Sequence, residues 1–320
     1  MSDAPSPAVA AAPVRMSRRA QPMPLFGPAV AGCSIVTATP IAFEGSFTVP
    51  ATAAVFAGHY PGRPILPGAY LIEAGLQAVE MAMNAGPDAP LRLLAVERFR
   101  LLQKILPGCP VTLRAVRLPP MEPAAAEVNW KHEVFLGDVL AARFRLTVGP
   151  AAQTAGVEAL SHAPEIGPGS VELDATAILR RLPHRWPLLL IDHARVLAAA
   201  RRIATTKSIS LGDPCYGDLH RSNESPSLAY PPSLILESFT QSAALLMTEV
   251  LADPVQTSAL MVFGGALKIS YDKEVFPGQT MSHKVLELTR YNNYALAGGL
   301  TLVGNKKIAA FEGLSVALLN

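Results

Sequence analysis

The chain has 320 residues, of which 50% are hydrophobic and 16% are charged, and its formal net charge at pH 7 is +2. This length is enough for two ordinary domains, and the apolar content supports a sizeable core, which excludes disorder over most of the chain. No strongly basic stripe runs through the sequence, so the composition also argues against nucleic-acid binding.

The cysteines and the hydropathy pattern exclude further classes of protein. Cys33, Cys109 and Cys215 lie far apart and show no metal-ligand spacing. This pattern argues against a disulfide framework or a zinc site and favours a reducing compartment, which we take as cytoplasmic. No stretch of about 18 uncharged apolar residues predicts a membrane span. Residues 1–25 are rich in Ala and Pro, and we expect a disordered leader rather than a secretory signal.

Two segments of the first half of the chain are similar in sequence to two segments of the second half. LPGAYLIEAGLQA (66–78) aligns with YPPSLILESFTQSA (230–243), so that Glu73 falls on Glu237 and Gln77 on Gln241. Further on, ILPGCPVTLRAV (105–116) aligns with VFPGQTMSHKVL (275–286). The same order and similar spacing indicate an internal duplication.

The stretch between the repeats predicts a domain boundary. Residues 149–170 are rich in Gly, Pro and Ala and lack a clear periodicity, so we interpret them as a linker. The chain then divides into a first unit, residues 26–148, and a second unit, residues 171–320.

The pattern of elements within each unit predicts an α+β fold. Residues 34–49 alternate and are rich in Ile, Val, Thr and Phe, which favours strands. Residues 68–84 predict a helix that is apolar on most faces and therefore buried. Strands follow over residues 91–148. The second unit repeats this order, with a buried helix over 232–251 and strands over 261–318, so each unit predicts an antiparallel sheet around one helix.

The segment AGHYPGRPILPGAYLIEAGLQ (57–77) carries the clearest chemical signal. It predicts that His59 lies in a loop rich in Gly and Pro, and that Glu73 lies further along on the buried helix. Gly62 and Gly68 allow a close backbone approach, and free N–H groups at the helix start can receive a developing oxyanion.

Several separated motifs resemble one enzyme family. HYPGRPILPGAYLIEAGLQ (59–77), ERFRLLQKILPGCPVTLRA (97–115) and LPHRWPLLLIDHARVL (182–197) resemble signatures of the hotdog-fold 3-hydroxyacyl-[acyl-carrier-protein] dehydratases. The resemblance covers nearly the whole chain and implies a double hotdog, in which the two central helices lie side by side. It also implies a dehydratase of fatty-acid or polyketide biosynthesis.

The resemblance further implies the composition of the main site. In the family, a His from one unit meets a Glu or Asp from the other, so we expect His59 to pair with Glu237. The substrate would arrive on the phosphopantetheine of an acyl carrier protein, and no metal or redox cofactor is implied. The fused units would supply the family's dimer-like interface within one chain.

The second unit departs from the family pattern. The spacing from His220 to Glu237 is longer than the spacing from His59 to Glu73, and the HxPG context around His220 is missing. Pro232 replaces the helix-start glycine, and proline removes an N–H donor. We therefore expect the mirrored site, His220 with Glu73, to be degenerate.

The residue types fit an elimination of water. A neutral histidine suits the role of base at the α-carbon, and a carboxyl on a buried helix stays protonated near neutral pH and can serve as the acid. N–H groups near Gly62 and Gly68 would stabilise the charge on the thioester oxygen. Gln77 and Gln241 either orient the acids one helical turn before them or make polar contacts between helices.

Other interpretations stay open at this stage. A hydratase or a double-bond isomerase would use the same α-proton step, and a hotdog protein that only binds acyl chains would need no catalysis. A hotdog thioesterase is disfavoured by the His-to-Glu pattern. For His184 and Arg185 a structural role is the default, and a solvated face is the default for a basic group that could otherwise meet a carrier protein: Arg63, Arg98, Arg100 and Lys104.

Overall fold

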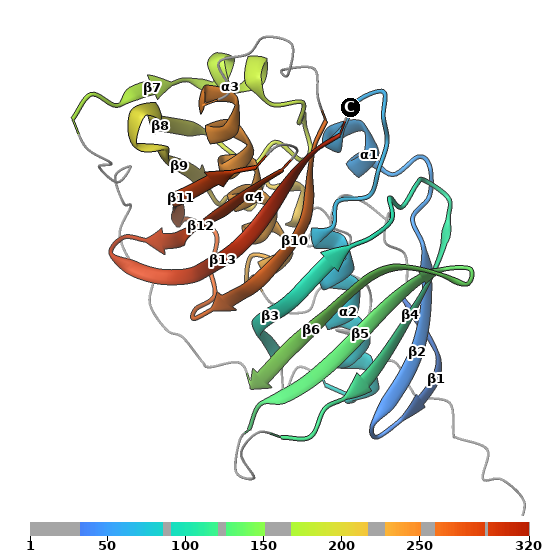
Figure 1. The fold of residues 1–320 in the computed structure, drawn as a ribbon. Coiled ribbons are helices and arrows are strands. Elements are labelled where there is room, and N and C mark those ends of the chain that lie inside the picture. Colours follow the sequence, from blue (N-terminus) through green and yellow to red (C-terminus); the bar gives the residue numbers. More distant parts are fainter. Residues whose placement is uncertain are drawn as a thin grey trace, which may run out of the picture.

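The computed structural model describes residues 33–85, 91–120, 126–150, 168–216, 228–250, 260–291 and 294–319. The predicted leader and most of the predicted linker lie outside these residues, so the boundaries of the two units stay predictions. The described strands form one antiparallel sheet of 13 strands in the order β1-β2-β4-β5-β6-β3-β10-β13-β12-β11-β9-β8-β7 (Figure 1). The strands of the first unit therefore fill one half of the sheet, and those of the second unit fill the other.

The described part of the first unit begins with a pair of strands, continues with two helices and ends with four strands. These elements are β1 (Ser34–Thr39), β2 (Ala42–Thr48), α1 (Ala54–His59), α2 (Ala69–Ala82), β3 (Leu91–Leu101), β4 (Pro110–Arg117), β5 (Val128–Leu136) and β6 (Val139–Pro150).

The second unit repeats this order with additions at its start. Its described part contains β7 (Val171–Leu173), α3 (Ala175–Arg181), β8 (His193–Leu197), β9 (Arg202–Ser208), α4 (Pro232–Val250), β10 (Leu260–Tyr271), β11 (Thr280–Arg290), β12 (Tyr294–Val303) and β13 (Lys306–Leu319). Single turns of 3₁₀ helix also form at Ala198–Ala200 and Pro214–Tyr216. Asp174 caps the N-terminus of the short helix α3, because its carboxylate accepts a hydrogen bond from the Ala177 N–H.

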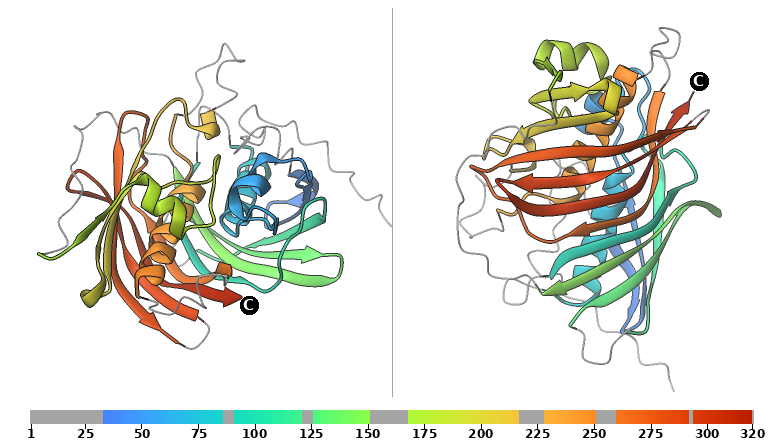
Figure 2. Two further views of the ribbon diagram at one scale, coloured as in Figure 1. Left: turned by 90° about the horizontal axis from the view of Figure 1, so that it is seen from above. Right: turned by 60° about the vertical axis from the view of Figure 1, so that its left-hand side comes forward.

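The two long helices are buried along most of their length, as their apolar sequences predict. All residues of α2 from Ala69 to Val79 are buried, and so are all residues of α4 from Ser233 to Met247. Both helices lie on one side of the curved sheet, as both views of Figure 2 show. The prediction of one buried helix in each unit is confirmed, so any polar group on the inner faces of these helices is held away from water.

The units join where β3 pairs with β10. The pairing is antiparallel and runs from Gly265 opposite Arg100 to Ser270 opposite Ala95. The rings of Phe99 and Phe263 stack across this seam with their centroids 5.0 Å apart. These two phenylalanines are equivalent positions of the duplication, because the same shift along the chain superimposes the two long helices. The seam is thus an approximate two-fold junction inside one chain.

One local prediction is wrong. The sequence predicts a loop around His59, but residues 54–59 form the short helix α1 and His59 is its last residue. The glycines in this stretch favoured a loop. The helix is accommodated because Gly58 packs directly against the second unit, where the Arg185 N–H donates to the Gly58 carbonyl at 2.8 Å. A tertiary contact therefore overrides the local preference.

None of the helices formed by the described residues is long and apolar enough to cross a membrane.

We predict that Gly265→Ala destabilises the seam. A Cβ atom at this position would lie 2.4 Å from the Phe99 carbonyl oxygen, and that backbone atom is fixed by strand pairing. The clash should lower the free energy of unfolding by about 1–3 kcal/mol, measured by urea denaturation. Gly212→Ala is the matched control, because its Cβ would meet no atom closer than 3.5 Å. Equal midpoints for the two variants would contradict the packing argument.

Candidate active site

His59 and Glu237 come from different units and meet at the seam. His59 ends α1 of the first unit, and Glu237 lies on α4 of the second. Both are buried, with 6% and 4% of their surfaces exposed. The nearest imidazole nitrogen and carboxylate oxygen lie within 4.8 Å of each other. This distance is within the span of one small substrate, so the two groups can act on neighbouring atoms.

Gly58 explains how His59 approaches the second unit so closely. A Cβ atom at position 58 would lie 2.9 Å from both the Arg185 carbonyl oxygen and the Pro187 ring. Only a residue without a side chain allows this approach. The imidazole beside it is thereby brought against the loop that carries His184.

A single hydrogen bond sets the proton position on His59. Its Nδ1 lies 2.9 Å from the Ile65 carbonyl oxygen, which can only accept, so Nδ1 carries the proton in the neutral ring. The Nε2 atom is then left with its lone pair. Burial lowers the pKa of His59 to about 4, partly offset by the bond to Ile65, so the ring is neutral at physiological pH.

Glu237 is shifted in the opposite direction. Burial raises the pKa of its carboxyl to about 7, and a hydrogen bond from Gln241 lowers it in part. The Gln241 Nε2 atom donates to Glu237 Oε1 at 2.9 Å and to the Leu188 carbonyl at 2.7 Å, while its Oε1 accepts from the Leu190 N–H at 2.9 Å. Gln241 is therefore fixed on three sides and orients the carboxyl one helical turn before it.

His184 is a third member of the site, although the sequence alone predicts a structural role for it. Its Nε2 lies 3.6 Å from Glu237 Oε1, and its ring centroid lies 5.5 Å from that of His59. Burial, followed by the charges of His59 and Arg185, lowers its pKa well below the usual value, so this contact joins a neutral ring to the carboxyl rather than an ion pair. The histidine within LPHRWP was the available signal, but only tertiary structure brings it to the site.

Tyr60 closes the cluster on the side of the first unit. Its ring centroid lies 4.2 Å from that of His59 and 5.4 Å from that of His184. Its hydroxyl donates a hydrogen bond to the Met261 carbonyl on β10, so Tyr60 connects the two units.

His59, His184 and Glu237 also have the atom types of a metal site with two histidines and a carboxylate. Among the described residues they form the one such group.

The three groups border a small buried cavity at the seam. Its volume is about 20 Å³, enough for one or two water molecules, and its other walls are mostly apolar, from residues such as Leu66, Phe263 and Ala244. Gly68 also lines it at the start of α2, where a Cβ atom would lie 2.9 Å from the Phe263 ring. Among the described residues the Gly68 N–H has no hydrogen-bond partner.

The structure does not bring every predicted residue to this cavity. Gly62 is exposed, has a φ of +82° and does not line the cavity, so it serves the turn after His59 rather than an oxyanion. Glu73 and Gln77 lie at a second pocket, where the Gln77 Nε2 donates to Glu73 Oε1 at 3.3 Å. His220, the predicted partner of Glu73, lies outside the described residues.

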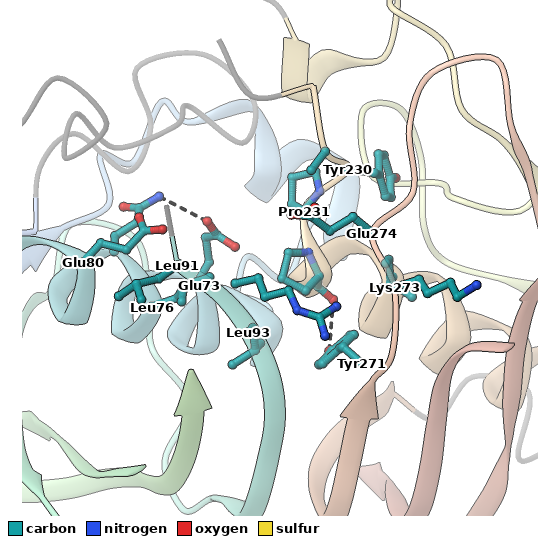
Figure 3. A pocket seen from close by; sticks show the side chains of 15 residues that line it. Glu73, Leu76, Glu80, Leu91, Leu93, Tyr230, Pro231, Tyr271, Lys273 and Glu274 are labelled. Carbon is teal, nitrogen blue, oxygen red and sulfur yellow. Dashed lines mark hydrogen bonds between the residues drawn. The ribbon is translucent and has the colours of Figure 1, made fainter. Parts of the chain in front are cut away.

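The second pocket occupies the two-fold-related position at the seam. Figure 3 shows Glu73 and Leu76 on one side of it, facing Tyr230 and Tyr271 of the second unit. Its volume is about 120 Å³, larger than that of the cavity at Glu237. Burial raises the pKa of Glu73, although bonds from Ser233 and Gln77 oppose that rise. The buried carboxyl is thus present in both halves of the molecule.

Comparison with known proteins places the sequence beside dehydratases. Residues 37–152 match the family named ApeI-like, described as ApeI dehydratase. A protein of Koribacter versatilis named 3-hydroxyacyl-[acyl-carrier-protein] dehydratase FabZ is 34% identical over 136 residues, which make up 42% of this chain and 82% of the relative. A protein of the same name from Enterococcus faecalis is 29% identical over 142 residues, which make up 44% of this chain and 96% of that relative.

Comparison with solved structures covers both units. The dehydratase domain of RzxB from Pseudomonas fluorescens matches with a TM-score of 0.61 at 13% sequence identity, over 91% of this chain and 98% of that domain. At this identity the likeness concerns the fold alone. It confirms the predicted double hotdog, with both units and their helices included.

We predict that Glu237 makes stability depend on pH. Because its pKa is about 7 in the folded chain and 4.5 in the reference state, its contribution is fully present below pH 4.5 and is lost as the pH rises through 7. Glu237→Gln removes this loss, so at pH 8 the variant should be more stable than the wild type by on the order of 3 kcal/mol. The urea midpoints of both chains, measured from pH 5 to pH 8, test this.

The control for that series is Glu127→Gln, which changes an exposed carboxylate. Its midpoint should track the wild type at every pH. A constant difference between Glu237→Gln and the wild type across the range would show that the buried carboxyl does not titrate as described.

Proposed function

The chain belongs to the family of 3-hydroxyacyl-[acyl-carrier-protein] dehydratases, and we propose that it removes water from a 3-hydroxyacyl thioester to form the trans-2-enoyl thioester. The observation that carries the proposal is the pair formed by His59 and Glu237, an imidazole and a carboxyl from opposite units within 4.8 Å in one buried cavity. The substrate would be carried on the phosphopantetheine of an acyl carrier protein, in fatty-acid or polyketide biosynthesis.

The protonation states of the pair suit an elimination. For free side chains the carboxyl has the lower pKa and the imidazole the higher one, but burial inverts this order to about 4 for His59 and about 7 for Glu237. Between these values the imidazole is unprotonated and the carboxyl holds its proton. These are the forms that a base and an acid need.

The proposed reaction uses each group once. His59 Nε2 takes the proton from the α-carbon, and the C–H electron pair forms the new double bond as the bond from C3 to the hydroxyl oxygen breaks. Glu237 gives its proton to that oxygen, which leaves as water. The proton on His59 then returns to Glu237 through solvent or the departing water, which restores both groups.

Two further groups would support this step. The thioester oxygen gains negative charge as the α-proton leaves, and the Gly68 N–H at the start of α2 can donate to it, aided by the helix dipole. Gln241 acts as a positioning residue, because it contacts Glu237 rather than the reacting atoms.

The acyl chain requires movement in the cavity wall. A volume of about 20 Å³ does not hold an acyl group, so side chains such as Met261 and Phe263 have to change rotamer when substrate enters. The chain would then run along α4 past Thr240 and Ala244, which line the same cavity. The proposed chemistry needs no metal or redox cofactor.

His59→Ala tests the proposal. Loss of the base should lower the turnover of a short 3-hydroxyacyl carrier-protein substrate by about 10²–10⁴-fold, with formation of the enoyl product followed by mass spectrometry. His193→Ala is the matched control, because that histidine is only partly buried and lies on β8 beside Glu172. A chelator should leave the wild-type rate unchanged.

The outcomes separate the competing functions. If wild type and His59→Ala form the enoyl product at equal rates, or neither forms it although both bind substrate, this site does not catalyse dehydration and an acyl-binding role takes its place. If the product is a 3-enoyl thioester, or if only the reverse addition of water is detected, the site is that of an isomerase or a hydratase.

We predict a bell-shaped dependence of kcat/KM on pH. Activity should fall below a pH near 4, as His59 becomes protonated, and above a pH near 7, as Glu237 loses its proton. Gln241→Met removes a donor that stabilises the carboxylate, so the pKa of Glu237 rises and the alkaline limb moves to higher pH. A variant that is slower but keeps the alkaline limb in place would refute this role for Gln241.

A further inference from the structure

Three side chains at the catalytic cavity also converge in the way that metal ligands do. A ring nitrogen of His59, a ring nitrogen of His184 and a carboxylate oxygen of Glu237 all lie within 4.8 Å of one another. Donor atoms about 2.0–2.1 Å from a tetrahedral zinc ion are separated by roughly 3.4 Å. His184 Nε2 and Glu237 Oε1, at 3.6 Å, already have nearly this separation. The set therefore needs only a small adjustment to surround one ion.

The backbone after His59 already presents the nitrogen that a metal ion requires. The Nδ1 atom lies 2.9 Å from the Ile65 carbonyl oxygen, so the ring proton is held there and the Nε2 lone pair is available. A ligating histidine usually donates its second N–H to a carbonyl or a carboxylate, because this bond fixes the tautomer and the orientation of the ring. His59 has this arrangement before any ion binds.

His184 is free to complete the set, and Glu237 is already oriented. The Nδ1 atom of His184 has no hydrogen-bond partner among the described residues, and its Nε2 approaches Glu237 at a distance longer than a hydrogen bond. A small rotation of this ring toward an ion therefore breaks no hydrogen bond. The carboxyl of Glu237 is held by the bond from Gln241 Nε2 at 2.9 Å, which gives it a fixed orientation.

The adjoining cavity supplies a position for a fourth ligand and indicates the kind of ion. All three side chains line this cavity, and its volume of about 20 Å³ holds one or two water molecules. Two histidines and a glutamate with an open fourth position form one of the usual zinc sites. Mg²⁺ and Ca²⁺ prefer six or more oxygen ligands, so two imidazoles in a buried site disfavour them.

We propose that His59, His184 and Glu237 form an inhibitory Zn²⁺ site. Both Nε2 atoms and one carboxylate oxygen coordinate the ion, and a water molecule in the cavity is the fourth ligand. The inhibition rests on the proposed function: the lone pair that would take the α-proton is bound to the metal, and Glu237 is held as a carboxylate with no proton to give. The ion also fills space that the substrate enters, so the two compete.

The binding test uses the full-length chain and Co²⁺ as a spectroscopic probe. We expect one ion per chain, with the visible absorption of four-coordinate cobalt, and displacement by Zn²⁺. Loss of a residue that only orients a ligand typically lowers metal affinity 10–100-fold. His184→Gln and Glu237→Gln each remove a ligand itself, so each should weaken Zn²⁺ binding by about 100-fold or more.

His193→Ala is the matched control for the binding series. His193 Nε2 lies 3.8 Å from Glu172 Oε2 on a partly exposed surface, and this pair belongs to no group of three ligands among the described residues. The variant should bind Zn²⁺ as tightly as the wild type does. A loss of affinity in this variant that equals the loss in His184→Gln would contradict the assignment of the site.

The kinetic test follows dehydration of a 3-hydroxybutyryl N-acetylcysteamine thioester at buffered concentrations of free Zn²⁺. At low substrate concentration the rate should fall by half at a Zn²⁺ concentration equal to the Kd from the binding test. More substrate should shift this midpoint upward, and EDTA should restore the full rate. A chelator thus protects this enzyme rather than inactivating it.

Three results would overturn the inference. The first is a wild-type chain that binds neither Co²⁺ nor Zn²⁺, which needs no variant to interpret. The second is binding that both ligand substitutions leave unchanged, which places the ion elsewhere. The third is a rate that stays constant or rises when Zn²⁺ is bound. A metal-free wild-type chain without dehydratase activity refutes the proposed function alone, because the cobalt spectrum and the Zn²⁺ affinity do not depend on turnover.

Discussion

The antiparallel pairing of β3 with β10 is the interaction on which the rest of this molecule depends. It turns two sheets into one and places α2 and α4 on the same side of it. Without the seam each helix would face water along its inner side, and Glu73 and Glu237 would be solvated carboxylates of ordinary acidity. The hydrogen bond from Ser233 on α4 to Glu73 on α2 exists only because the helices meet. The sheet pairing therefore also has an electrostatic effect: it buries the carboxyls of Glu73 and Glu237, and this burial raises the pKa of both.

Desolvation acts in opposite directions on the imidazole of His59 and the carboxyl of Glu237, the two groups of the proposed reaction. Burial disfavours the charged form of each, so it lowers the pKa of an imidazole and raises that of a carboxyl. A histidine and a glutamate placed in one buried cavity become a neutral imidazole and a neutral carboxyl without any further charged partner. The proton location on His59 needs one more element, the Ile65 carbonyl, which fixes the tautomer. The loop between His59 and α2 thus sets the tautomer of His59 through its backbone rather than its side chains.

The sequence predicts the fold and part of the site, and the reason differs for each part. The helices are predictable because a long run of residues that is apolar on most faces has few alternatives to burial, and the duplication shows that the pattern occurs twice. His59 and Glu237 are predictable only through the motif, because they lie in different halves of the chain and no local rule pairs them. The sequence does not predict the helix that carries His59, because Gly58 favours a loop and only its tertiary contact with Arg185 stabilises the helix. His184 is not predictable as a site residue for the same reason: only its tertiary neighbours bring it to Glu237.

The duplication explains why the two pockets differ in size and chemistry. Under the proposed function, the site at Glu237 carries the reaction, and the second pocket needs no complete set of catalytic groups. Pro232 is acceptable at the start of α4 because the first N–H groups of a helix have no partner within it, so proline costs little stability there although it removes an N–H donor. Glu73 is buried, and both of its oxygens accept hydrogen bonds from within the protein, from Gln77 and Ser233, so the carboxyl is satisfied without a ligand.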